Sequence, residues 1–428
     1  MIKTIETKAD LNLATIVIPN CGIAKGIISV DLHEANSTKD QTIFECFSDL
    51  LLSGTKSLSR EELLDKVNSL GSSIDAQVSG GILTIEISST QKGWKKTLAI
   101  LSDILSEPAF SQTELKRATK LAFNNLNDEK EDSKAIAYEA FKNNFFAATD
   151  RRSSTKISTL QENLSKLTNK DVKEMYARMY KRPWTASVTG DKSVCTSFSK
   201  LVTDSTEKIK LSDLTLAVSD KTSEPQKLVL HDVPSRQNLD INIGCPVALK
   251  LGDAEFSALV FGISVLAKWG GFAGRLMSTV REKEGLTYGI YGRLEGYSAS
   301  DNGYLRIGTF FSPAQVSQGL QSTFREIKKI HEHGITHSEY KSFPTIMETQ
   351  SIMRNDSPIS SIRVLHEFSK LGCTIEQMNA YEAELQSVTK EEINAAIKKY
   401  LNPKNMTISA AGPTKGVEKE LHALCKKL

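Results

Sequence analysis

The sequence lacks the features that mark disulfide-stapled, membrane-spanning and secreted proteins. Its six cysteines lie far apart in a chain of 428 residues, with no Cys-x-x-Cys pair. Dispersed cysteines indicate buried free thiols rather than disulfides or a cysteine metal site. No apolar run approaches the roughly 18 residues of a membrane span, and residues 1–8 lack the apolar core of a signal peptide. We therefore expect no membrane span and a cytoplasmic location, with a processed precursor as the alternative.

An excess of charge of one sign is missing as well. The chain has 54 basic and 51 acidic residues, a formal net charge of +3. Proteins that bind nucleic acid usually carry a strong basic excess on one face, so we expect no nucleic-acid partner. A hydrophobic content of 39% with only 11 prolines indicates a globular protein, and the length predicts about two to four domains.

The chain does contain an internal repeat of long period. In each half, a strand-like run leads into a helical stretch and then into a second helix, for which Thr113 and Ser338 are candidate caps. The corresponding segments are 83–87, 94–106 and 108–116 in the first half, and 304–307, 314–332 and 333–341 in the second. The shared order predicts two similar domains, with chance similarity as the alternative.

The ends of the two halves also match. Residues 167–172 and 388–393 each open an amphipathic helix, and Thr168 with Asp171 predicts a capping box. After each helix come a tyrosine, a proline and a strand-like run that closes on a glycine. These residues are Tyr180, Pro183 and Gly190 in the first half, and Tyr400, Pro403 and Gly412 in the second.

The region between the halves, 211–226, mixes Ser, Thr, Asp and Lys with one proline, which is typical of a linker. We therefore predict an N-terminal domain at 1–210 and a C-terminal domain at 227–428. Strand signals alternate with long helical patterns in both halves. The predicted fold class is α+β, with two homologous domains that each have a mostly antiparallel sheet covered by helices.

A glycine-rich stretch in the second half precedes a short helix and a strand. It has three glycines in five residues, including Gly270 and Gly271, which allow close approach of another chain. Arg281 follows on a helical turn, which Gly285 ends before a strand predicted at 286–291. Taken alone, this arrangement is common in α/β proteins and indicates a structural role.

The run 281–288, Arg-Glu-Lys-x-Gly-Leu-x-Tyr, resembles the C-terminal-domain signature of pitrilysin-type (inverzincin) metallopeptidases. This family includes insulin-degrading enzyme, mitochondrial processing peptidase and the core subunits of the respiratory bc1 complex. The resemblance covers nearly the whole chain, because the duplicated plan fits a processing-peptidase-like clamshell half. It implies that Arg281 and Tyr288 reach into a catalytic chamber. The preceding Gly-Gly stretch then predicts substrate binding by Gly270, Gly271 and Phe272.

Peptide hydrolysis explains why such a pair would be used. The tetrahedral intermediate places negative charge on the former carbonyl oxygen, and the Tyr288 hydroxyl could donate to it. Arg281 supplies fixed, charged donors for carbonyl groups of a bound peptide. The alternative roles are a solvated helix residue for Arg281 and a half-buried strand residue for Tyr288.

The zinc motif of the active family members is missing. They bind zinc through His-x-x-Glu-His, followed by a Gly-Thr landmark. Counting back from Gly54 and Thr55 places Glu45 at the first His, Ser48 at the catalytic Glu and Asp49 at the second His. The family's third ligand would fall near 124–127, where no acid occurs. None of the seven histidines forms His-x-x-Glu-His or His-Glu-x-x-His.

We therefore expect no metal in this chain and no peptidase activity from it alone. Glu45 and Asp49 could hold a hard cation such as Mg²⁺ or Ca²⁺, but a partly exposed acidic helix face is the commoner explanation for such a pair. Ser48 cannot replace the general base that accepts a proton from the attacking water.

The resemblance implies the zinc-less subunit of a heterodimeric metallopeptidase. Zinc would lie in a paralogous partner, and Arg281 with Tyr288 would complete its site for hydrolysis of short or unfolded peptides. One alternative is an inactive structural or peptide-binding subunit, like the bc1 core subunits. Another is an inactive homodimer that acts as a holdase.

Overall fold

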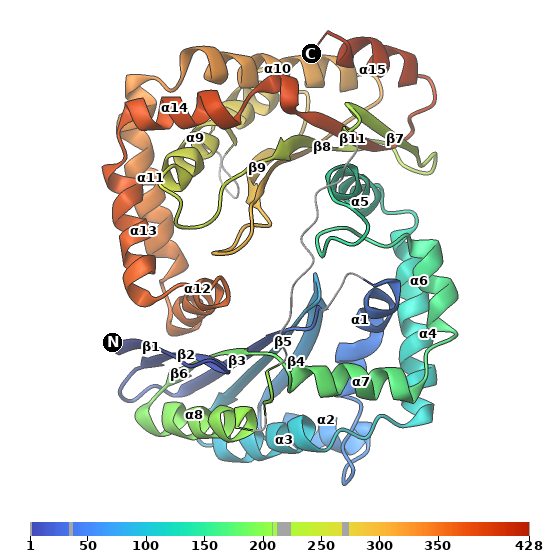
Figure 1. The fold of residues 1–428 in the computed structure, drawn as a ribbon, viewed down its shortest axis with the longest axis vertical. Coiled ribbons are helices and arrows are strands. Elements are labelled where there is room, and N and C mark those ends of the chain that lie inside the picture. The colour runs from blue at the N-terminus through green and yellow to red at the C-terminus, as the bar shows by residue number, and fades with distance from the viewer. Residues whose placement is uncertain (1, 34–36, 208, 212–223, 268–273, 428) are drawn as a thin grey trace. The chain divides into compact units, whose positions relative to one another are not determined.

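The computed structural model describes residues 2–33, 37–207, 209–211, 224–267 and 274–427 (Figure 1). The chain forms two compact units. Unit 1 contains Met1–Leu126, Thr155–Ala217 and Ser351–Ile375, and unit 2 contains Asn127–Ser154, Val218–Gln350 and Glu376–Leu428. Unit 1, built mostly from the first half of the sequence, therefore includes a segment of the second half. Unit 2, built mostly from the second half, includes a segment of the first. Residues 212–223 of the predicted linker lie outside the described residues, and the boundaries at 210 and 227 stay predictions.

Unit 1 is built on a sheet that has six strands in its described residues. The strands are β1 (Ile2–Thr7), β2 (Leu11–Val17), β3 (Ile23–Asp31), β4 (Ser73–Ser79), β5 (Ile82–Thr90) and β6 (Trp184–Gly190). Their order is β1-β2-β6-β3-β5-β4, and only β2 and β6 pair in parallel. In β5 the core-facing Leu83, Ile85 and Ile87 alternate with half-buried residues, the two-residue period of a strand.

Helices cover this sheet on both faces. They are α1 (Thr38–Leu51), α2 (Arg60–Ser69), α3 (Trp94–Ser106), α4 (Gln112–Glu129), α6 (Ile157–Leu164), α7 (Asn169–Met179), α8 (Lys192–Thr206) and α12 (Pro358–Lys370). On one face α3 and α8 bury Trp94 and Phe198 in the core, while α12 lies on the opposite face (Figure 1). The capping box predicted for α7 is confirmed, because Thr168 and Asp171 bond reciprocally.

Unit 2 repeats the same plan. Its described strands are β7 (Leu228–Asp232), β8 (Leu239–Pro246), β9 (Ile290–Glu295), β10 (Tyr304–Phe311) and β11 (Thr407–Gly412). They form a sheet in the order β7-β11-β8-β10-β9, with only β7 and β11 parallel. This order matches β2-β6-β3-β5-β4 strand for strand. The predicted α+β class, with two similar domains that each have a mostly antiparallel sheet covered by helices, is confirmed.

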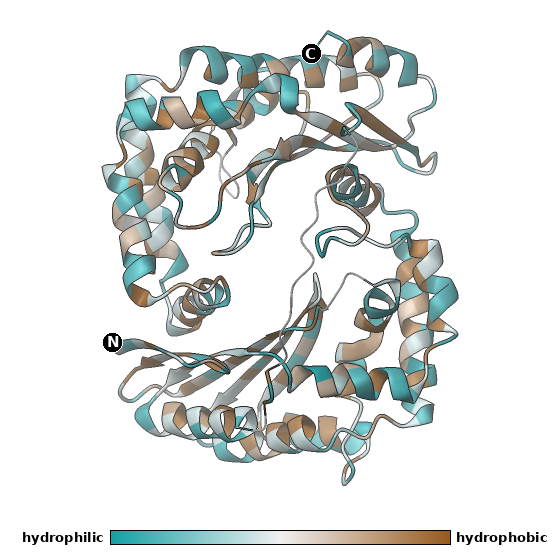
Figure 2. Cartoon of the chain, viewed as in Figure 1, coloured by the Kyte–Doolittle hydropathy of each residue, from teal (hydrophilic) through white to brown (hydrophobic). Residues whose placement is uncertain are grey.

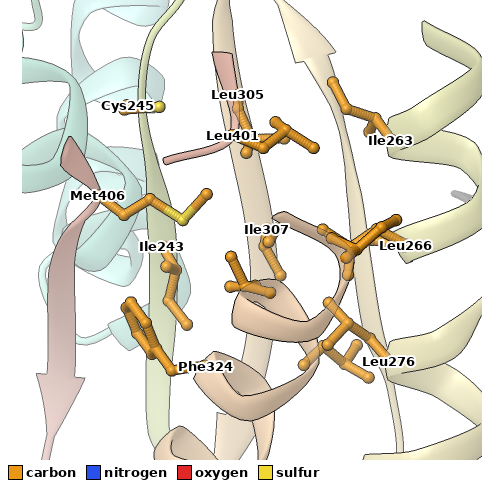
Figure 3. Packing of buried hydrophobic residues seen from close by; sticks show 14 of the residues in the cluster. Ile243, Cys245, Ile263, Leu266, Leu276, Leu305, Ile307, Phe324, Leu401 and Met406 are labelled. Atoms are coloured by element: carbon orange, nitrogen blue, oxygen red, sulfur yellow. The ribbon is translucent and has the colours of Figure 1, made fainter. Parts of the chain in front are cut away.

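The helices of unit 2 complete its core. They are α5 (Ser133–Phe145), α9 (Phe256–Ala267), the π-helix η1 (Met277–Lys283), α10 (Val316–His333), α11 (His337–Arg354), α13 (Ile375–Ser387), α14 (Lys390–Tyr400), the 3₁₀ turn η2 (Pro403–Asn405) and α15 (Glu418–Cys425). Figure 3 shows Ile243 and Ile307 of the sheet packed with Leu266 of α9 and Phe324 of α10. Brown and teal alternate along α10 and α14 in Figure 2, as expected of amphipathic helices.

Each unit receives a helix from the other half of the sequence. The helix α12 packs on β2, β3 and β6 of unit 1, and α5 packs on β7, β8 and β11 of unit 2. A glycine makes room for α5, since a Cβ on Gly244 would lie 3.0 Å from the Phe141 ring and 1.9 Å from the Leu305 carbonyl. In unit 1, Ile362 and Leu365 of α12 are buried against the sheet. Both sheets are therefore covered on two faces.

Two local predictions need correction. The helices α4 and α11 are capped by Ser111 and Thr336, not by Thr113 and Ser338. A capping hydroxyl accepts a hydrogen bond from the backbone N–H three residues further on. The distance from that hydroxyl oxygen to the backbone nitrogen is 3.2 Å in both helices. The strand predicted at 286–291 begins later, at Ile290.

All six cysteines are free, as predicted. Four of them are buried, whereas Cys21 and Cys425 are only half-buried. Within the part of the chain that the structure describes, no helix is long and apolar enough to cross a membrane.

A buried histidine joins α12 to its sheet. Ser29 Oγ lies 2.8 Å from His366 Nε2, and Ser187 Oγ lies 2.9 Å from Nδ1. Burial lowers the pKa of His366 from 6.5 to about 3, so the ring is neutral in the folded protein. Because the folded pKa lies below the unfolded one, protonation favours unfolding. This contribution to stability is intact above pH 6.5 and declines as the pH falls toward 3.

We predict that protonation of His366 lowers the free energy of unfolding by about 2 kcal/mol when the pH falls from 7 to 5. Each pH unit below 6.5 lowers this free energy by up to about 1.4 kcal/mol. The His366→Gln variant should lose this part of the pH dependence. Urea unfolding at both pH values measures it. His337→Gln, at an exposed position of α11, should behave as wild type. Equal slopes in wild type and His366→Gln would contradict the prediction.

Candidate functional site

The positions predicted for the zinc motif lie on α1. Cys46 and Phe47 are buried in the core of unit 1, which fixes the rotation of the helix. Glu45 is exposed, and Ser48 and Asp49 are half-buried. Because residues four apart share a helix face, Glu45 and Asp49 lie on the same side of α1.

An arginine from α4 is bonded to the carboxylate at the second of these positions. Arg117 Nη2 forms an ion pair with Asp49, and its Nε donates to Glu114 Oε2 at 2.6 Å. The side chains of Arg117 and Asp49 are each 30% exposed, so the pair is partly shielded from water. Burial opposes the charge, but Glu114 and Asp49 outweigh it and raise the pKa of Arg117. The guanidinium therefore holds α1 and α4 together with a fixed positive charge.

These residues do not fit a zinc ion. The positions predicted for both family histidines hold carboxylates, and Asp49 is already bonded to Arg117. Burial raises the pKa of the neighbouring Cys46 thiol to about 12, which keeps it protonated and unsuited to a metal. Asn124 and Asn125, near the expected third ligand, are exposed amides on α4. Among the described residues, no group of three or more His, Cys, Asp or Glu could hold a metal ion.

The second predicted site follows η1 in unit 2. Tyr288 is 77% exposed, although Leu286 and Thr287 beside it are buried. The Arg281 guanidinium carbon lies 4.7 Å from the centre of the Tyr288 ring, a cation–π contact. Gly285 adopts φ 63°, a left-handed conformation that ends η1 and turns the chain toward Tyr288. The structure thus brings the two predicted residues together at the surface of unit 2.

An ion pair anchors the start of this segment. Arg275 donates from Nε and Nη2 to the two carboxylate oxygens of Glu339, both at 2.7 Å. Glu339 also accepts the N–H of Thr336 at the start of α11, and together with Arg275 this bond outweighs burial and lowers the pKa of Glu339. A π-helix such as η1 is rare and often marks a functional site. Gly270, Gly271 and Phe272 lie outside the described residues, so their predicted role stays a prediction.

Sequence reasoning missed Arg117. Arg117 follows Glu114 by three residues, on the helix expected to carry the third metal ligand. This spacing could have indicated an ion pair near the predicted metal position. Only the packing of α4 near α1 shows that it reaches Asp49.

Comparison with known families agrees with this fold. Residues 47–162 match the family model described as Insulinase (Peptidase family M16), and residues 166–342 match the one described as Peptidase M16 inactive domain. The two matches together span more than half of the chain. The chain belongs to the M16 peptidase family, which confirms the predicted family.

Two relatives are similar in sequence. The chain is 21% identical over 415 residues to the non-peptidase homolog YmxG of Helicobacter pylori, covering 94% of this chain and 93% of that protein. A stretch of 156 residues is 28% identical to the uncharacterized zinc protease SCO5738 of Streptomyces coelicolor, covering 36% of this chain and 33% of that protein.

Solved structures share the fold. The peptidase M16 inactive domain from Pseudomonas fluorescens superimposes with a TM-score of 0.82 at 16% identity, covering 97% of this chain and 98% of that one. A protease from Helicobacter pylori gives 0.80 at 15% identity, covering 96% and 99%. The periplasmic protease PqqL from Escherichia coli gives 0.72 at 14% identity, where this chain matches 46% of the longer one.

The Arg117 ion pair yields a stability prediction. Arg117→Met should lower the free energy of unfolding by about 1 kcal/mol, because it leaves Asp49 and Glu114 without their shared cation. A double-mutant cycle with Asp49→Asn should give a coupling of about 0.5–1 kcal/mol, limited by solvent screening of a partly exposed pair. Urea unfolding measures both.

Lys120→Met, at an exposed position of the same helix, is the matched control and should change stability little. A coupling energy indistinguishable from zero would mean that Arg117 and Asp49 do not stabilise the contact between α1 and α4.

Proposed function

We propose that this chain is the zinc-less subunit of a heterodimeric M16 peptidase and contributes Arg281 and Tyr288 to the zinc site of a paralogous partner. The observation that carries the proposal is the exposed Tyr288 stacked beside Arg281. A large aromatic side chain that is 77% exposed gains little from burial within its own unit. Its position suits a hydroxyl group that acts on a bound molecule.

The geometry suits stabilisation of a transition state. The Tyr288 hydroxyl can donate to the oxygen that becomes negative when water attacks a peptide carbonyl. The Arg281 guanidinium packs against the ring, which limits the rotamers of both side chains and supplies charged donors for peptide carbonyl groups. The bond between Arg275 and Glu339 holds the start of η1, so that the pair is supported by a fixed backbone.

The remaining chemistry must come from the partner. Ser48 stands where we predict the general base of the family, and Arg117 forms an ion pair with Asp49 at a predicted metal-ligand position. A partner with an intact zinc motif would supply the metal, the activated water and the proton acceptor. Short or unfolded peptides are the proposed substrates, because an extended backbone can be recognised without a fixed sequence.

A second candidate is a non-enzymatic subunit that binds peptides or has a structural role. The names of a relative and a structural neighbour, a non-peptidase homolog and an inactive domain, favour it. In that case Arg281 and Tyr288 are remnants of an ancestral active site.

The test is hydrolysis of a quenched fluorescent peptide by this chain alone, by a zinc-bearing paralogue from the same genome, and by the mixture. We expect chelator-sensitive activity in the mixture only. Tyr288→Phe and Arg281→Ala should each lower kcat at least about tenfold, the scale of one lost transition-state donor. Neither change removes a buried group, so the complex should still assemble.

Lys283→Ala, at an exposed position of the same π-helix, is the control and should keep full activity. A stable complex that lacks activity would favour the non-enzymatic candidate. Full activity in the Tyr288→Phe complex would contradict the role of the hydroxyl. Chelator-sensitive activity from this chain alone would overturn the placement of the zinc motif on Glu45, Ser48 and Asp49.

A further inference from the structure

One face of the strands that follow Tyr288 carries charged side chains. Ile290 and Leu294 of β9 point into the core of unit 2, so Arg293 and Glu295 lie on the opposite face. In β10, Arg306 lies on that same face, between the core-facing neighbours Leu305 and Ile307.

The register of the sheet places two arginines directly opposite each other. Arg306 pairs with Arg293 across the antiparallel strands β10 and β9. Like charges at directly opposed positions destabilise a sheet unless an anion compensates them. Glu295 does so in part, because its Oε1 accepts from Arg293 Nε at 2.8 Å and from Arg306 Nε at 3.0 Å.

The capacity of Glu295 to accept further hydrogen bonds is taken up. Its Oε2 accepts from the hydroxyls of Tyr138 at 3.0 Å and Tyr304 at 3.2 Å. Burial favours protonation of Glu295, but Arg306 and Arg293 outweigh it and lower its pKa, so the group stays ionised. One carboxylate is therefore shared by two guanidinium groups and two phenols.

Two charged side chains of α5 lie near this group. Lys142 stacks 4.8 Å from the Tyr138 ring centre, and Glu139 is close enough to favour its charged form. Burial nevertheless lowers the pKa of Lys142, with a smaller contribution from Arg306. Arg306 also donates from Nη1 to Asn242 Oδ1 at 2.9 Å, so its guanidinium is held in place beside Arg293.

The Arg293 guanidinium is accessible on the side of β9. The Arg293 side chain is 49% exposed, whereas Arg306 and Glu295 are only 11% and 10% exposed. Among the described strands β9 lies at one edge of the sheet, where an extended chain can lie alongside. At about 3.4 Å per residue, the five residues from Tyr288 to Arg293 span no more than about 17 Å. A peptide held at Tyr288 could therefore reach Arg293 within about five of its own residues.

We propose that Arg293, backed by Arg306, binds a carboxylate of the peptide that this subunit holds at Tyr288. The inference rests on the proposed function and adds a preference to it: peptides with an acidic group within about five residues of the bond at Tyr288. A planar guanidinium is well suited to a carboxylate, which it can bind through two parallel N–H groups. That carboxylate is either an Asp or Glu side chain or the C-terminus of the peptide.

Direct binding to the isolated chain tests this without need of activity. The probes are fluorescently labelled, unstructured Gln/Ser peptides of about ten residues, long enough to extend from Tyr288 past Arg293. One series carries a single Glu moved along the peptide, and each member is made with a free or an amidated C-terminus. Fluorescence anisotropy should show about tenfold tighter binding when one carboxylate is correctly placed. The Glu series and the free-acid series separate the two sources.

Arg293→Gln should remove the preference, and Arg293→Glu should reverse it toward peptides with Lys. Arg293→Lys should restore part of it. Arg236→Gln, at an exposed arginine between β7 and β8, is the matched control and should bind as wild type. A purely structural role would lower the thermal unfolding midpoint of Arg293→Gln and leave the charge preference unchanged. That result, or equal binding of acidic and neutral peptides by wild type, overturns the proposal.

Activity of the mixed complex separates this inference from the function on which it rests. If the complex is active and depends on Tyr288 but shows no acidic preference in KM, the carboxylate site is wrong and the proposed function stands. If the isolated chain prefers acidic peptides through Arg293 but no mixture is active, the site stands without the peptidase role.

Discussion

The structure depends on covering both faces of two twisted sheets. One face of each sheet is apolar and packs under helices of its own unit, with core residues such as Ile85 and Ile307 fully buried. The other face receives a single helix from the opposite half of the sequence, α12 in unit 1 and α5 in unit 2. Each unit thereby contains chain from both halves of the sequence.

The faces under the exchanged helices carry buried polar side chains beside apolar ones, and hydrogen bonds compensate for the burial of these polar groups. In unit 1 the ring of His366 is held between Ser29 and Ser187, and Lys25, only 4% exposed, pairs with Glu86 at 2.6 Å. In unit 2 the arginine pair of β9 and β10 shares one carboxylate. A buried polar group without a partner is costly, so these faces constrain the sequence as well. They also retain side chains that can serve binding.

The two predicted sites differ in the groups that they present. In unit 1 the positions predicted for the zinc histidines hold carboxylates, and the Arg117 ion pairs place a positive charge beside Asp49. In unit 2 the segment from η1 to Tyr288 keeps an exposed aromatic residue beside a guanidinium on an anchored backbone. The Arg117 guanidinium bonds α4 to α1, but a guanidinium cannot activate water as a metal ion does.

The sequence by itself determined the repeat, the α+β class, the family and the lack of a His-x-x-Glu-His motif. These follow from local information: strand and helix periods, capping pairs such as Thr168 with Asp171, and a contiguous motif from Arg281 to Tyr288. Only the tertiary structure decided the exchange of α5 and α12, the bond from Arg117 to Asp49, and the meeting of Arg293 with Arg306. These depend on strand register and on packing between segments far apart in the chain, for which no local pattern is sufficient.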